Sequence, residues 1–183
     1  MRKIILGISA YYHDSAACLL IDGRLAAAAQ EERFTRIKHD ASFPANAVSY
    51  ILDENGLKVS DLTAISFYDK PILKFERLLE TYHGLVPGGL PGFLSAIPVW
   101  VKEKLFMKNM LWKEFDKIEG AHLKKRPALT FPEHHISHAA SAFYPSPFQE
   151  AVILTVDGVG EWATTTICHG RKNEIKILKD LLA

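Results

Sequence analysis

The feature of this sequence that most constrains its fold is a segment that occurs twice. Residues 3–30 contain an apolar run, a loop and two further apolar runs around Asp22-Gly23, a pair typical of a hairpin turn. Residues 151–178 show the same order, with a predicted turn at His169-Gly170. The repeat predicts an internal duplication of a three-strand meander. At a constant offset of 147 residues, the matched positions are Ile5 and Val152, Leu6 and Ile153, Ala16 and Ala163, Leu20 and Ile167, Gly23 and Gly170, and Arg24 and Arg171.

Helix and strand patterns alternate between the two meanders. Helices are predicted at 43–57 and 136–146, and strands at 62–69 and from residue 128. Residues 93–118 form an amphipathic helical pattern, and its aromatic residues are predicted to lie in the core: Phe93, Trp100, Phe106, Trp112 and Phe115.

This order of elements predicts an α/β protein with the actin/hexokinase-like ATPase fold, in which two ribonuclease H-like lobes are duplicates of each other. The first lobe is predicted at residues 1–149, with a helical insertion at about 70–126. Residues 150–183 are predicted to be the first hairpin strands of the second lobe.

In such a fold the first loop of each meander faces a cleft and holds phosphates. The second of these loops contains Asp157, Gly158 and Gly160. Glycines let the backbone approach a phosphate closely, and an aspartate can hold a hydrated magnesium ion. The alternative is that these residues only connect two strands of a hairpin.

Charge, cysteine content and hydropathy argue against several classes of protein. The 22 basic and 21 acidic residues give a net charge of +1, which does not favour binding to nucleic acid or to a membrane surface. Two cysteines cannot form a disulfide framework, and no apolar run approaches the ~20 residues of a membrane span. The sequence therefore predicts a cytoplasmic protein with no nucleic-acid partner and no membrane partner.

Three histidines occur within five positions. His134 and His138 are four residues apart, so on a helix both imidazoles would lie on one face and could bind one ion. His135 would point about 100° away and is expected to have a structural role. Two ligands are too few for a structural zinc site, and imidazole ligands alone do not separate iron, manganese and zinc. The alternative is that the histidines cap the helix and bind only backbone groups.

A second group of candidate residues lies near the N-terminus. His13 and Asp14 are in the loop after the first strand, and a charged stretch follows the third strand. We take that third strand to be central in the sheet, and the position after a central strand is a common location for a site. Cationic side chains there could bind an anionic substrate, although a solvated surface loop is the alternative. The candidates are Arg33, Arg36, Lys38 and His39.

Three stretches together resemble the O-carbamoyltransferases, the group that modifies nodulation factors and antibiotics. They are residues 13–44, 134–148 and 154–162, beginning HDSAACLL, HHISHAAS and LTVDGVGE. The resemblance covers nearly the whole chain and corresponds to the N-terminal part of such an enzyme.

The resemblance implies a function. Carbamoyl phosphate is hydrolysed to carbamate, which ATP converts to carbamoyl-adenylate on a separate C-terminal domain that resembles a tRNA-modification protein. The carbamoyl group then passes, at the actin-like domain, to a hydroxyl group of a sugar, nodulation factor or antibiotic.

The resemblance also implies roles for residues. His134 and His138 match a histidine pair that holds Fe(II) or another divalent metal, which would polarise a carbamoyl or phosphate oxygen. His13 and Asp14 are the expected catalytic residues, and His13 matches a histidine that deprotonates the acceptor hydroxyl. Asp14 and the loop residues Asp157, Gly158 and Gly160 match the nucleotide cleft, where Mg²⁺ accompanies ATP.

The resemblance further implies that the family's aspartate metal ligand, its adenosine-binding glycines and its adenylating domain lie beyond residue 183. The chain is therefore expected to be a fragment or one part of a split gene, and exposed strand edges would favour a homodimer.

Three other functions remain open. A tRNA threonylcarbamoyl transferase would share the fold and the spaced histidines, but a near-neutral chain shows no evident excess of basic residues for tRNA. The chain could instead be a non-catalytic lobe that binds a metal or a partner. A sugar kinase of the same fold is the third, although it would not need imidazole ligands.

Overall fold

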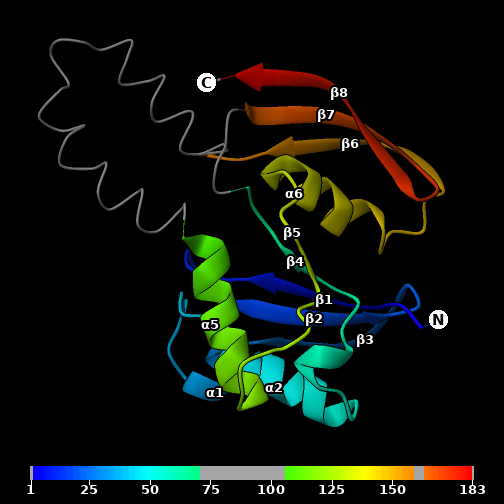
Figure 1. Cartoon of the computed structure of the whole chain (residues 1–183). Coiled ribbons are helices and arrows are strands. Elements are labelled where there is room, and N and C mark those ends of the chain that lie inside the picture. The colour runs from blue at the N-terminus through cyan, green and yellow to red at the C-terminus, as the bar shows by residue number, and fades with distance from the viewer. Residues whose placement is uncertain (1, 71–105, 159–162, 183) are drawn as a thin grey trace, which may run out of the picture. The chain divides into compact units, whose positions relative to one another are not determined.

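The computed structural model describes residues 2–70, 106–158 and 163–182 (Figure 1). The chain forms two compact units. The first comprises Met1–Tyr68 and Met107–Phe131, and the second comprises Asp69–Phe106 and Pro132–Ala183. The helix at residues 134–143 belongs to the second compact unit. The sequence instead predicted a domain boundary at residue 149, on the basis of the duplication. That boundary stays a prediction.

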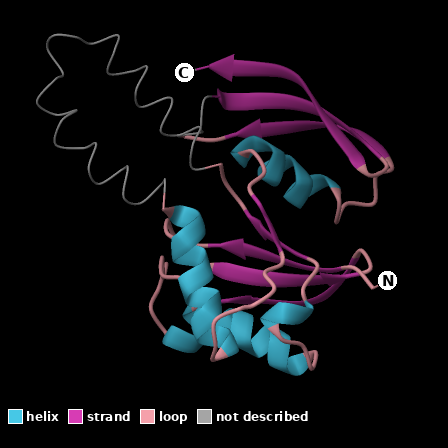
Figure 2. Cartoon of the chain, in the orientation of Figure 1, coloured by secondary structure: helices cyan, strands magenta, loops and turns pink. Residues whose placement is uncertain are grey.

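The first unit is built on a five-stranded sheet with the order β3-β2-β1-β4-β5. The strands are β1 (Ile4–Ser9), β2 (Ala16–Ile21), β3 (Arg24–Gln30), β4 (Ala64–Phe67) and β5 (Ala128–Thr130). β1, β2 and β3 pair antiparallel, whereas β4 and β5 run parallel to β1 (Figure 2). The first hairpin turns at Asp22-Gly23, where φ is 51° and 79°, as a tight hairpin requires. The predicted meander is confirmed.

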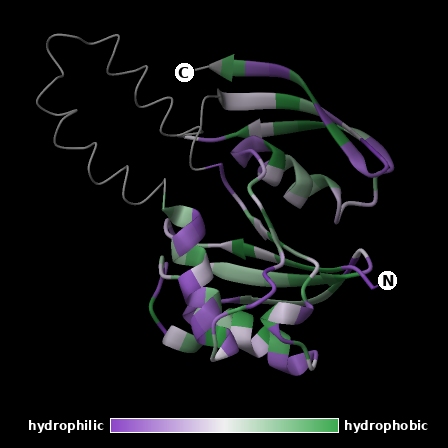
Figure 3. Ribbon diagram, viewed as in Figure 1, coloured by the Kyte–Doolittle hydropathy of each residue, from purple (hydrophilic) through white to green (hydrophobic). Residues whose placement is uncertain are grey.

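Helices supply the rest of the core of this unit. They are α1 (Glu32–Thr35), α2 (Ala45–Glu54) and α5 (Met107–Glu119), together with the 3₁₀ helix η1 (Val59–Asp61). α2 buries Ala47, Val48, Ile51 and Leu52, which recur at helical spacing, against the buried side chains of β1 and β2. Figure 3 shows the mixture of hydrophobic and hydrophilic residues that this one-sided burial produces on α2 and α5.

The aromatic pattern of α5 is only partly confirmed. Trp112 and Phe115 are buried in the core, as predicted. Phe106, the residue before α5, is 51% exposed, so this part of the prediction is wrong. Phe93 and Trp100 lie outside the described residues. Within the described ranges, no helix combines the length and apolar character that a membrane span needs.

A buried glutamate joins the end of β3 to the beginning of α2. Glu31 is 2% exposed. Its carboxylate accepts hydrogen bonds from Asn46 N at 3.1 Å, Asn46 Nδ2 at 2.7 Å and Ala47 N at 2.9 Å. The first backbone N–H groups of a helix have no partner within the helix, so Glu31 supplies acceptors for α2 from outside it.

Glu31→Ala is expected to destabilise the protein by about 2–4 kcal/mol, because the buried N–H of Ala47 and two part-buried donors of Asn46 would lose a charged acceptor. Urea unfolding monitored by circular dichroism measures this change. The matched control is Glu54→Ala at the exposed C-terminal end of α2, which is expected to change stability by less than about 0.5 kcal/mol. Equal losses for the two variants would contradict the role of Glu31.

The second unit contains a three-stranded antiparallel sheet with the order β6-β7-β8. Its elements are α6 (His134–Phe143), β6 (Glu150–Val156), β7 (Ala163–Arg171) and β8 (Glu174–Leu182). Ala139 and Phe143 of α6 pack with Ile153 and Cys168 in a small core. The α/β class and the second meander are thus confirmed. The prediction of the actin-like fold was based on these two meanders and the helices between them.

The position of the second turn differs from the prediction. His169-Gly170 lies within β7, and the chain turns at Lys172-Asn173, where Lys172 has a φ of 54°. A Cβ atom at position 170 would lie 2.9 Å from the side chains of Ile153 and Phe143. Gly170 therefore allows α6 to pack closely on the sheet. The constant offset of 147 residues holds for the first strands of the two meanders and fails at the second turn.

Candidate functional site

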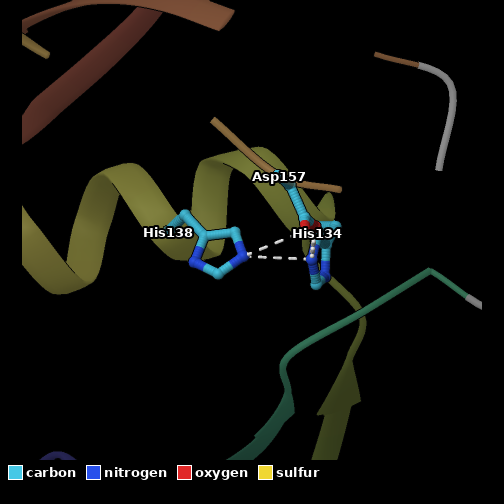
Figure 4. Close-up of side chains that lie close together, drawn as sticks. All are labelled: His134, His138 and Asp157. Carbon is cyan, nitrogen blue, oxygen red and sulfur yellow. Dashed lines mark hydrogen bonds and ion pairs between the residues drawn. The ribbon is translucent and has the colours of Figure 1, made fainter. Parts of the chain in front are cut away.

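Two histidines and one aspartate converge in the second unit (Figure 4). His134 Nε2 lies 2.7 Å from Asp157 Oδ2 and 3.0 Å from His138 Nε2. His138 Nε2 lies 3.8 Å from the same Asp157 oxygen. The side chains of His134, His138 and Asp157 are 13%, 51% and 28% exposed, so His138 is the most accessible of the three.

Local structure explains why these three side chains meet. His134 is the first residue of α6, and His138 follows one turn later on the same face. Asp157 is the first residue after β6, the strand on which α6 packs. The buried Asp69 places Oδ1 4.0 Å from His134 Nδ1, on the opposite side of that ring. Ligand histidines in metalloproteins commonly have a carboxylate beyond the second ring nitrogen.

The donor set fits a divalent transition metal. Bonds of about 2.0–2.2 Å from one ion place ligand atoms roughly 3–3.5 Å apart, close to the separations in this group. Two imidazole nitrogens that face each other at 3.0 Å need a shared proton or cation, because two lone pairs repel. Two imidazoles with one carboxylate are typical ligands of Fe(II). These ligands do not by themselves distinguish Fe(II) from manganese or zinc. Three protein ligands leave open positions for water or substrate.

The structure adds Asp157 to the predicted histidine pair. The sequence suggested a nucleotide-binding role for this residue and an aspartate ligand beyond residue 183. The sequence signal that could have found it is a carboxylate directly after a strand predicted to pack on the histidine-bearing helix.

His135 has a different environment from its two neighbours. It is 5% exposed, and its Nδ1 lies 2.6 Å from Thr155 Oγ1 and 2.9 Å from Thr166 Oγ1. The two threonine hydroxyls also hydrogen-bond to each other. His135 therefore joins α6 to β6 and β7, which agrees with the structural role expected from its direction on the helix.

A second polar group lies in the first unit. Asp14 Oδ2 is 2.7 Å from His13 Nδ1, and Asp14 Oδ1 is 2.9 Å from His39 Nδ1. The hydrogen bonds from His39 and His13 hold the pKa of Asp14 below its ordinary value. The structure thus brings together two residues predicted to be catalytic and one predicted to bind substrate.

The other predicted substrate-binding residues do not join this group by any contact in the described residues. Arg33, Arg36 and Lys38 are exposed, and Arg33 Nη2 lies 3.7 Å from Glu32 Oε1. The expectation that this stretch follows a central strand is wrong, because β3 is an edge strand of the five-stranded sheet. The distinction depends on the strand order, which local sequence does not determine.

The predicted phosphate loop is described only in part. Gly158 follows Asp157 and has open space where a Cβ atom would lie. Gly160 lies outside the described residues. Binding of phosphate by this loop stays a prediction.

Two curated proteins are similar to the chain over most of its length. Uncharacterized protein sll1178 of Synechocystis sp. is 54% identical over 171 residues, which make up 93% of this chain and 28% of that protein. Nodulation protein NolNO of Sinorhizobium fredii is 33% identical over 171 residues, or 92% of this chain and 23% of that protein. The chain thus spans about a quarter of the length of these relatives.

Two solved structures from Pseudomonas aeruginosa also match, at low sequence identity. YeaZ is 14% identical with a TM-score of 0.42, and the match covers 97% of this chain and 65% of that one. An uncharacterized protein with similarity to peptidase YEAZ is 15% identical with a TM-score of 0.44, covering 97% and 64%.

A family model settles the relationship that the three sequence stretches suggested. The model described as "Carbamoyltransferase N-terminus" matches residues 4–182, which is nearly the whole chain. The predicted resemblance to carbamoyltransferases is therefore confirmed. The chain belongs to the carbamoyltransferase family and matches its N-terminal part.

Proposed function

We propose that this chain is the N-terminal part of an enzyme that carbamoylates a hydroxyl group of a small molecule, such as a sugar, a nodulation factor or an antibiotic. The family match over residues 4–182 is the observation that carries this proposal. The similarity to a nodulation protein supports a hydroxyl acceptor. The carbamoyl group would come from carbamoyl phosphate and be activated by ATP with Mg²⁺ as carbamoyl-adenylate.

We assign the metal-binding role to His134, His138 and Asp157. Their converging nitrogen and oxygen atoms would hold Fe(II) or a similar divalent ion. Such an ion, when bound, stabilises negative charge on a carbamoyl or phosphate oxygen. The residues themselves orient one another, because α6 fixes the two histidines one turn apart and β6 positions the carboxylate.

We assign proton transfer to His13. Its imidazole would take the proton of the acceptor hydroxyl while the hydroxyl oxygen forms a bond to the carbamoyl carbon. The bond between that carbon and the adenylate oxygen breaks, and AMP leaves with the electron pair. In the first unit, the exposed cations Arg33, Arg36 and Lys38 would bind an anionic group of the substrate. In the second unit, the glycines of the predicted phosphate loop, Gly158 and Gly160, would bind phosphate.

The test uses the natural gene product that carries this sequence. It is incubated with ATP, Mg²⁺, ¹³C-labelled carbamoyl phosphate and a panel of polyol acceptors, and products are identified by mass spectrometry. We expect AMP, pyrophosphate and an acceptor bearing a ¹³C-carbamoyl group. In a parallel incubation with tRNA, threonine, ATP and ¹³C-bicarbonate, a labelled product on tRNA adenosine would instead support the threonylcarbamoyl-transferase alternative. Absence of both carbamoyl-adenylate and labelled product would overturn the proposal.

A further inference from the structure

One carboxylate in the first unit contacts two imidazoles through the same ring position. Each oxygen of Asp14 has its own partner, His13 Nδ1 at 2.7 Å and His39 Nδ1 at 2.9 Å. A carboxylate only accepts hydrogen bonds, so each Nδ1 must carry the proton in these contacts. The Nε2 atom of a neutral imidazole in this tautomer is an acceptor.

The backbone holds the two loops that carry these residues against each other. Tyr11 N donates to Ala41 O, and Ser15 N donates to Asp40 O, both at 2.8 Å. Asp14 and His39 have φ values of 51° and 57°, in the left-handed region that non-glycine residues seldom adopt. Such conformations persist where the surrounding structure imposes them, and they cluster at functional sites.

The loop that carries His39 has a further anchor that does not depend on Asp14. Asp40 is buried, and it accepts hydrogen bonds from Ser42 N and Ser42 Oγ at 2.9 and 2.6 Å, and from Thr35 Oγ1 at 2.7 Å. These bonds hold the pKa of Asp40 below its ordinary value. The loop is therefore expected to keep its conformation when Asp14 is substituted. A change in the histidine tautomers can then be attributed to the lost contacts with Asp14.

We propose that Asp14 is a positioning residue whose two oxygens fix His13 and His39 as Nδ1–H tautomers, so that both present an unprotonated Nε2 to a hydroxyl-bearing ligand. In this proposal Asp14 positions two imidazoles instead of lining a nucleotide cleft. His39 accepts a hydrogen bond from a hydroxyl group instead of binding an anionic substrate. Two imidazole Nε2 atoms that are hydrogen-bond acceptors suit the hydroxyl groups of an uncharged polyol, which can donate to them, better than a phosphate, which offers mainly acceptor oxygens.

The use of this histidine pair in catalysis rests on the proposed function. The assignment of the tautomers rests only on the contacts of Asp14 with the two histidines. In that function, an Nε2 lone pair on His13 is what a proton acceptor needs, and the second Nε2 on His39 would accept a hydrogen bond from a neighbouring hydroxyl of the acceptor.

The test is ¹⁵N NMR of the natural gene product labelled at histidine, at a pH above about 7.5 where unperturbed imidazoles are neutral. His13→Gln and His39→Gln assign the two signals. We expect both histidines to show the Nδ1–H tautomer in the wild type. Asp14→Asn keeps one acceptor oxygen and a side chain that tolerates a positive φ, so one histidine is expected to revert to Nε2–H. Asp14→Ala is expected to release both.

The matched control is Asp22→Asn. Asp22 also has a positive φ of 51° and accepts a hydrogen bond from Lys3 N, but it has no contact with either histidine. This variant is expected to leave both histidine signals unchanged.

In the carbamoyl transfer assay, Asp14→Asn is expected to lower kcat about 10-fold or more while carbamoyl-adenylate formation continues. Nε2–H tautomers in the wild type, or no change on Asp14→Asn, would overturn the proposal. If the wild-type protein shows both predicted tautomers but transfers no carbamoyl group, the proposed function is refuted. The positioning role of Asp14 then stands.

Discussion

Alanine at His134 or at His138 is expected to remove most of the bound metal from the natural gene product. The two Nε2 atoms and Asp157 Oδ2 are three donors that converge among the described residues of the second unit. Loss of one imidazole leaves two of these three donors, which weakens the hold on a divalent ion against exchange with water. We expect the iron content to fall from about one equivalent per chain to less than roughly a tenth.

Elemental analysis after gel filtration measures this loss, with manganese and zinc quantified in the same samples. His169→Ala is the matched control, because His169 lies in the same unit and pairs with Glu150 at 2.8 Å on the surface. His135→Ala is expected to retain the metal while lowering the unfolding midpoint, since His135 is buried against two threonines. Equal metal content in the His134, His138 and His169 variants would refute the assignment.

Alanine at His13 is expected to abolish transfer to the acceptor while carbamoyl-adenylate continues to form. General-base catalysis by a positioned histidine contributes about 10²–10⁴-fold, so kcat for transfer should fall by that amount. Formation of the adenylate is proposed to occur on another domain and does not need this imidazole. The two partial reactions are separated by following AMP release and acceptor carbamoylation in one time course.

His122→Ala provides the control for this second experiment. His122 lies in the same unit and pairs with Asp116 on the surface, with no contact to His13, Asp14 or His39 among the described residues. It is expected to transfer carbamoyl at the wild-type rate. Loss of both partial reactions in His13→Ala would place His13 at adenylate formation or in folding, and wild-type transfer would remove it from the mechanism.

The sequence predicted the features that depend on short-range geometry. The turn at Asp22-Gly23 was correct because both residues must adopt a positive φ, which this pair tolerates. The common face of His134 and His138 was correct because helical periodicity alone brings residues four apart together.

Features that depend on the packing of distant segments were missed. Gly170 has the residue type of a turn, but it allows α6 to approach the sheet, and local sequence does not separate these two uses of glycine. β3 lies at an edge because β4 and β5 are added at the opposite side of the meander, next to β1. Asp157 meets the histidines only because β6 packs on α6, and Glu31 caps a helix that begins 14 residues later along the chain.

The stretch that includes α1 combines two kinds of residue that can vary separately in evolution. Glu31 holds the beginning of α2 and Asp40 holds the loop between α1 and α2, whereas His39 contacts Asp14 on the surface. A relative that retains Glu31 and Asp40 but has lost His13, Asp14 and His39 would therefore be expected to fold and yet be a pseudoenzyme. Genomes can be sorted by this criterion before any protein is purified.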